Sequence, residues 1–163
     1  MKSTLANLAL EGALAMTFAH DGLRDALTHL AAPPYFYENL RRDLATAERN
    51  KSRLTLIRFV LQVNAEELNN ESQYELAVLN FAELLKSSIR SEDLCARLGL
   101  LEFTLILKSS VDVGVSLAER VLQGLNLDGF QCGYSILEVS PKESSLEILN
   151  RLDNQELRSI THS

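Results

Sequence analysis

The chain has 163 residues, 46% apolar and 23% charged, so it can bury a core without disulfides or structural metals. Its net charge is −6 and Arg41-Arg42 is its longest basic run, so nucleic acid is not an expected partner. Cys95 and Cys132 lie in apolar stretches without C-x-x-C spacing or a nearby histidine cluster. We therefore expect two reduced, buried thiols in a cytoplasmic protein, and neither a bound metal nor another cofactor.

The first 32 residues are predicted to form an N-terminal helical segment, a helix over residues 4–31 with a break near Gly22. Asn7, Glu11 and Gly12 interrupt its apolar stretch, so a signal peptide or a membrane span is not expected. The helix either packs on its own domain or pairs with a second copy in a homodimer. Its small apolar residues would permit close helix contact; they are Ala6, Ala9, Ala13, Ala15 and Ala19.

Residues 33–163 alternate between the apolar periods of helices and strands, which indicates an α+β domain with a mostly antiparallel central sheet flanked by helices. Pro33 and Pro34 start a helix that runs over about 35–50, since proline suits a first helical turn. Ser144 and Glu147 form a capping box that opens a last helix to about residue 158. Between these helices we predict a strand over 54–61, a loop over 63–70, a helix over 71–89, strands over 94–98 and 101–107, a helix over 111–125 and a strand over 130–139.

Two local expectations follow from side-chain patterns. Gly99 and Leu100 should form a tight hairpin turn, because glycine permits the backbone angles that such turns need. The helix over 71–89 should bury one apolar stripe, made of Leu76, Leu79, Ala82, Leu85 and Ile89.

Two short runs carry a resemblance to a known family. Arg90-Ser91-Glu92-Asp93 is an R-x-x-D, and Gly99-Leu100-Leu101-Glu102-Phe103 resembles a damaged G-G-[DE]-E-F. Asp25 to Thr28 is similar to D-x-L-T, and Ala118 to Arg120 matches A-E-R. In order and spacing these runs resemble the GGDEF domain, which makes cyclic di-GMP. The resemblance implies a palm-like nucleotidyl-cyclase fold over 33–163, although Ala32 and Pro33 replace the family's Asn and Arg.

The same resemblance implies that catalysis is lost. Phosphoryl transfer of this kind needs divalent metals, and Mg²⁺ prefers carboxylate oxygens. The family supplies them from its first strand, where this chain has Val60 and Gln62, and from the hairpin, where Leu101 replaces one acid. Leu100 replaces the second glycine and would crowd the substrate's approach. We therefore predict that the chain is not an enzyme and that Glu102 is an exposed residue beside the turn.

In the family, R-x-x-D is a product-binding inhibitory site. The resemblance implies that Asp93 accepts hydrogen bonds from a guanine edge, that Arg90 contacts guanine and phosphate, and that Arg120 supplies a second arginine. The chain would then be a catalytically inactive cyclic di-GMP receptor of bacterial signalling. The alternative is a scaffold for dimerisation or a partner protein that no longer binds nucleotide, in which Arg90 merely favours a helix end and Asp93 caps a turn.

Arg97 has two open interpretations. It either keeps a strand edge soluble or is a structural arginine of the family type. His20, His29 and His162 show no metal-ligand spacing, so no role in a site is expected for them.

Overall fold

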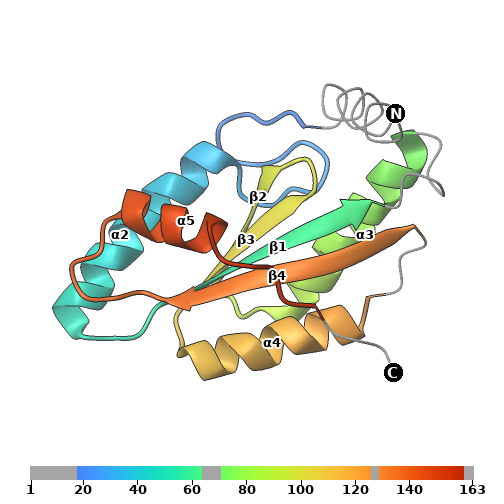
Figure 1. Ribbon diagram of the computed structural model, residues 1–163. Coiled ribbons are helices and arrows are strands. Elements are labelled where there is room, and N and C mark those ends of the chain that lie inside the picture. Colours follow the sequence, from blue (N-terminus) through green and yellow to red (C-terminus); the bar gives the residue numbers. More distant parts are fainter. Residues whose placement is uncertain (1–17, 64–70, 126–128, 160–163) are drawn as a thin grey trace.

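The computed structural model describes residues 18–63, 71–125 and 129–159 (Figure 1). Its sheet has four strands in the order β2-β3-β1-β4, and every neighbouring pair is antiparallel. This arrangement confirms the predicted α+β class. Figure 1 shows α2 and α5 on one face of the sheet and α3 and α4 on the other. The elements are α2 (Pro33–Asn50), β1 (Thr55–Val63), α3 (Glu71–Ser88), β2 (Leu94–Gly99), β3 (Glu102–Leu107), α4 (Val111–Gln123), β4 (Phe130–Glu138) and α5 (Ser145–Asp153).

Local sequence signals set several helix boundaries. The helix predicted over about 35–50 is α2, which begins two residues earlier, at Pro33, and ends where Lys51 adopts a left-handed backbone with φ of 52°. At the start of α5, the Ser144 hydroxyl accepts the backbone N–H of Glu147 at 3.2 Å, which confirms the capping box. Helix α5 ends at Asp153 rather than near residue 158, because the following segment returns to the sheet.

The helix predicted over residues 4–31 is wrong for its described part. Residues 18–31 form turns and isolated bridges instead, and the prediction for residues 1–17 lies outside the described residues. The Asp21 carboxylate accepts the backbone N–H groups of Leu23 and Arg24 at 2.9 and 2.8 Å, and Gly22 has φ of 90°. A short acidic side chain that satisfies nearby N–H groups favours a turn over a helix.

Both edges of the sheet carry one further backbone pairing. On the β2 edge, Ala31 forms a parallel bridge with Ala96. On the β4 edge, Tyr134 and Arg158 exchange two backbone hydrogen bonds, of 2.9 and 2.7 Å. Residues from before α2 and after α5 therefore flank the four strands.

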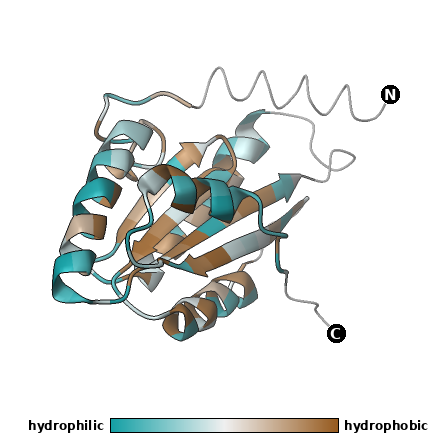
Figure 2. Ribbon diagram, turned by 60° about the vertical axis from the view of Figure 1, so that its left-hand side comes forward, coloured by the Kyte–Doolittle hydropathy of each residue, from teal (hydrophilic) through white to brown (hydrophobic). Residues whose placement is uncertain are grey.

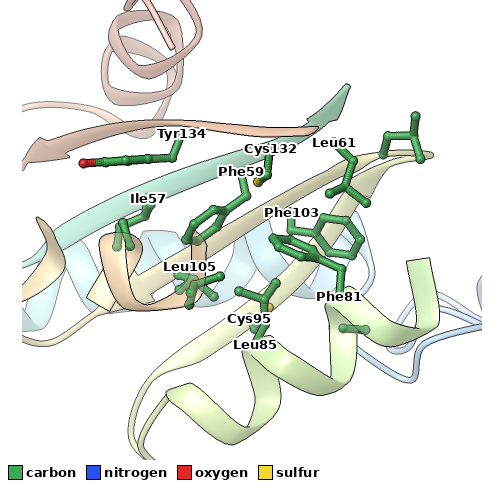
Figure 3. Packing of buried hydrophobic residues seen from close by; sticks show 14 of the residues in the cluster. Ile57, Phe59, Leu61, Phe81, Leu85, Cys95, Phe103, Leu105, Cys132 and Tyr134 are labelled. Atoms are coloured by element: carbon green, nitrogen blue, oxygen red, sulfur yellow. The ribbon is translucent and has the colours of Figure 1, made fainter. Parts of the chain in front are cut away.

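Alternating residues of β1 face two separate cores, as expected for a strand covered on both sides. Leu56 belongs to the core under α2 and α5, whereas Phe59 belongs to the larger core under α3 and α4. In the larger core the Phe81 ring contacts those of Phe59 and Phe103, with centroids 5.6 and 4.9 Å apart (Figure 3). Figure 2 shows brown, hydrophobic colour on the strands and teal, hydrophilic colour on much of the helices.

The stripe predicted for α3 is only partly right. Ala82 and Leu85 are buried, but Leu76 is 60% exposed. The helix instead turns Tyr74, Val78 and Phe81 inward. Burying the large aromatic rings removes more apolar surface from water, so they set the helix orientation. No helix among the described residues is both long and apolar enough to cross a membrane.

The two cysteines are free and buried, which confirms the expectation of unpaired thiols. Burial raises the pKa of the Cys132 thiol to about 12 and the pKa of the Cys95 thiol still further. The reactive thiolate is therefore scarce at neutral pH.

We expect neither cysteine of the native protein to react with Ellman's reagent at pH 8 within minutes, because both are buried and protonated. Two equivalents should react promptly after unfolding in guanidinium chloride. Rapid reaction of one thiol in the native state, with unchanged circular dichroism, would show that its burial is only transient.

Candidate functional site

The β2–β3 hairpin turns at Leu100 and Leu101, one residue later than predicted. Gly99 is still in the ladder, paired with Glu102, after a register shift that follows Arg97. Its φ is not in the left-handed region, and an added Cβ would lie 3.5 Å from the Glu102 side chain, an ordinary contact. The assignment of Gly99 to the turn was wrong because this irregularity moves the register.

The two turn leucines are core residues. Leu100 and Leu101 are only 5% and 7% exposed and belong to the large core cluster that includes Phe103. The Leu101 carbonyl accepts the N–H of Leu61 on β1 at 2.9 Å. The turn is therefore filled with apolar side chains and bonded to the central strand.

A buried arginine holds the other carbonyl of the turn. Nε and Nη2 of Arg97 donate to the Leu100 oxygen at 3.2 and 2.9 Å. Nη1 of Arg97 donates to both carboxylate oxygens of Asp25 at 3.1 and 3.2 Å. The Arg97 and Asp25 side chains are 0% and 1% exposed. This pairing excludes the strand-edge solubility interpretation of Arg97 and supports the structural one.

Asp25 is fixed by further donors. The N–H and the hydroxyl of Thr28 donate to one carboxylate oxygen at 2.8 and 2.7 Å. Nζ of Lys86 on α3 donates to the Thr28 carbonyl at 2.6 Å. Burial lowers the pKa of the Arg97 guanidinium and Asp25 opposes that shift, so the guanidinium stays charged. The D-x-L-T run therefore supplies the buried carboxylate that binds Arg97.

The sequence predicts Glu102 to be a plain exposed residue, but the structure shows it in an ion pair. Its carboxylate accepts Nη2 of Arg58 at 2.8 Å, and Nε of Arg58 lies 3.4 Å from Asp153 at the end of α5. Arg58 stands on β1 and its side chain is only 18% exposed. The arginine neutralises the carboxylate that remains at the hairpin.

The strand register defines what faces Glu102. Its partner on β1 is Val60, one of the two positions where the family resemblance expected a carboxylate. The described residues hold no group of three or more His, Cys, Asp or Glu side chains able to share a metal ion. The Glu102 carboxylate on β3 therefore lies opposite Val60 and pairs with Arg58, both on β1.

The R-x-x-D run forms the turn between α3 and β2. Asp93 accepts the backbone N–H of Arg90 at 3.2 Å with one oxygen and that of Lys108 at 3.1 Å with the other. The Arg90 side chain is 73% exposed, and its nearest carboxylate, that of Glu92, is 3.9 Å away. Asp93 therefore caps this turn and ties it to the end of β3, while the Arg90 guanidinium faces solvent.

Arg120 is exposed on α4, the helix that packs beside α3. Gly124, the residue that follows α4, approaches Leu84 of α3: a Cβ on Gly124 would lie 3.5 Å from Leu84. No ion pair within the described residues engages Arg120, and none joins it to Asp93. The convergence of Arg90, Asp93 and Arg120 on one surface stays a prediction.

Comparisons with known proteins place these residues in context. The family model "Diguanylate cyclase, GGDEF domain" matches residues 23–132. Diguanylate cyclase DgcS of Shewanella oneidensis is 27% identical over 138 residues, in a match that covers 79% of this chain and 46% of that protein. The chain thus spans less than half the length of this curated relative.

Solved GGDEF domains share the fold. The DgcB domain of Caulobacter crescentus, in complex with c-di-GMP, superposes with a TM-score of 0.73 at 20% identity, over 83% of this chain and 88% of that one. The FimX domain of Pseudomonas aeruginosa gives 0.69 at 18%, over 80% and 88%. The palm-like fold expected from the sequence is thereby confirmed.

We predict that Asp25→Ala destabilises the protein by about 3–5 kcal/mol, because it leaves the Arg97 charge buried without its partner. Urea unfolding followed by circular dichroism would measure the change. Glu38→Ala is the matched control, since it breaks an exposed ion pair with Arg41 and should leave the unfolding midpoint unchanged. Equal midpoints for the two variants would contradict a structural role of the buried pair.

Proposed function

The chain belongs to the GGDEF domain family, and from this premise we propose that it binds cyclic di-GMP without synthesising it. The observation that carries the proposal is the state of Glu102, which pairs with Arg58 and lies opposite Val60. The hairpin retains its strand pairing, whereas the charged side chains around it differ from those of the family motif. Arg90, Asp93 and Arg120 are the proposed ligand-binding residues.

The loss of synthesis rests on the carboxylates. Joining two GTP molecules requires divalent metals to neutralise phosphate oxygens and to position the attacking hydroxyl. Val60, Gln62 and Leu101 carry no carboxylate at the positions where the family has acids. Arg58 also opposes metal binding at Glu102, because its guanidinium already pairs with one oxygen of that carboxylate at 2.8 Å and repels a cation. The curated relative DgcS is a cyclase, so inactivity would be a property of this chain rather than of the family.

The geometry of the R-x-x-D turn supports binding. Asp93 is held in place by two backbone N–H groups, and an ionised carboxylate has further lone pairs for a guanine edge. The Arg90 guanidinium is exposed and can pair with guanine acceptors or phosphate without first breaking a short ion pair. The DgcB structure contains c-di-GMP, which shows that a domain of this fold accepts the ligand.

A receptor signals by changing its contacts with another molecule when its ligand binds. We place this one in the cytoplasm, where cyclic di-GMP binding would alter contacts with a partner protein or a second copy. Such a switch requires the ligand to bind two states of the protein with different affinities. If no nucleotide binds, the chain is instead the scaffold that the sequence left as its alternative.

We expect calorimetry to show cyclic di-GMP binding to the wild-type chain with low-micromolar or tighter affinity. Arg90→Ala and Arg120→Ala should each weaken binding at least tenfold, about 1.4 kcal/mol, because each removes charged donors to the ligand. Arg49→Ala removes an exposed arginine from the end of α2 and should change nothing. A flat trace for the wild-type chain at high protein concentration would leave only the scaffold.

The chain incubated with GTP and Mg²⁺ should form no cyclic di-GMP detectable by chromatography, because the metal-binding carboxylates are replaced. The DgcS cyclase domain, assayed in parallel, is the positive control. Product that depends on the chain and on Mg²⁺ would refute the inactive assignment, whatever the outcome of the binding experiment.

A further inference from the structure

A groove of about 890 Å³ lies between the second half of α2 and the loop that joins β4 to α5. Figure 1 shows this loop running beside α2, beyond the ends of the strands. Neither the hairpin nor the R-x-x-D turn lines the groove, so it is separate from the site described above. Its volume is in the range of small-molecule sites in proteins.

The walls of the groove combine apolar and polar groups. Leu54, which is buried, and the partly buried Leu44, Ala47 and Val139 provide apolar surface. Hydroxyl groups lie among them, from Ser52, Ser140 and Ser145, while the hydroxyl of Ser144 is engaged by Glu147. An apolar surface with a few polar groups is typical of a site that orients a small ligand.

The charges that line the groove favour an anion. Lys51, Arg53 and Lys142 are exposed there, and no ion pair within the described residues engages them. Two acidic side chains that line the groove already accept hydrogen bonds from within the protein. Glu138 accepts the N–H of Val111 at 3.1 Å, and Glu143 is held by Arg151 at 2.8 and 2.9 Å.

Hydrogen bonds from Arg151 lower the pKa of Glu143, so this carboxylate stays ionised and paired. Glu48 is then the one acid of the lining without such an engagement in the described structure. On a chain with a net charge of −6, the groove is locally positive.

The backbone at two of these cations is unusual. Lys51 and Lys142 have φ of 52° and 65°, and His29 is the third described non-glycine residue with positive φ. The left-handed conformation is unfavourable for a side chain with a Cβ and is usually given to glycine or asparagine. Glycine would suit both positions better, so what lysine adds is a cation at each side of the groove.

From this combination we propose that the groove binds a small anion with an apolar body. The apolar body lies against Leu44, Leu54 and Val139. The carboxylate, sulfonate or phosphate head pairs with Lys51, Lys142 and Arg53, and serine hydroxyls donate to it. This site is separate from the proposed cyclic di-GMP site, because it shares no residue with the R-x-x-D turn.

The test compares two fluorescent probes of the same ring system. 8-Anilinonaphthalene-1-sulfonate carries a sulfonate, and N-phenyl-1-naphthylamine is its uncharged analogue. We expect the sulfonate to bind the wild-type chain at least tenfold more tightly. Lys51→Gly/Lys142→Gly should weaken it at least tenfold, and folding is protected because glycine suits both backbone conformations.

The matched control is Arg42→Ala/Arg49→Ala, which removes the same charge from exposed parts of α2 outside the groove. It should leave the affinity unchanged. Equal affinity for the two probes, or equal weakening by the two double variants, would overturn the proposal. Amide chemical shifts on adding the sulfonate should move around Leu44–Lys51 and Val139–Ser145; shifts confined to Arg90–Asp93 would assign the probe to the other site.

Discussion

The buried ion pair between Arg97 and Asp25 is the constraint on which this molecule depends. Two charges removed from water are costly unless each finds its partners. The two charges pair across 72 residues of sequence, and each also bonds a neighbour three residues away: Thr28 donates to Asp25, and Arg97 donates to the Leu100 carbonyl. The pair thereby joins the segment before α2, the strand β2 and the hairpin turn into one unit. This unit holds the hairpin turn in place with Leu100 and Leu101 at its tip, where the family motif has a glycine and an acid.

A second arginine determines the charge beside the hairpin. Arg58 on the inner strand β1 places a permanent positive charge between Glu102 and Asp153. A guanidinium satisfies carboxylates by hydrogen bonds but cannot lower the pKa of a bound water or polarise a phosphoryl group as a metal ion does. Val60 pairs with Glu102 in the β1–β3 ladder, which is built from backbone groups, so this register needs no carboxylate at position 60. The strand pairing and the side-chain charges at this hairpin are therefore separate features.

Signals that act over a few residues were predictable from the sequence, and contacts between distant residues were not. Pro33 and the Ser144 capping box fixed helix starts because their effects are local. The register shift after Arg97 places the turn one residue later than predicted. The Asp21 turn lies within residues 18–31, where a helix was predicted. Arg97 and Asp25 are 72 residues apart, and Arg58 and Glu102 are 44 apart, so no spacing rule could pair them. The division at residue 32 and the roles of Arg90, Asp93 and Arg120 stay predictions.

The bridges at Ala31 and Arg158 have a consequence for how this domain can associate. An exposed edge strand offers unpaired amides to any other extended chain and is a common start of aggregation. Here Cys95 and Arg97 of β2 are bonded to Ala31, and Tyr134 of β4 is bonded to Arg158, so segments of the same chain occupy part of each edge. A strand that added to the sheet in register with these positions would first have to displace those segments.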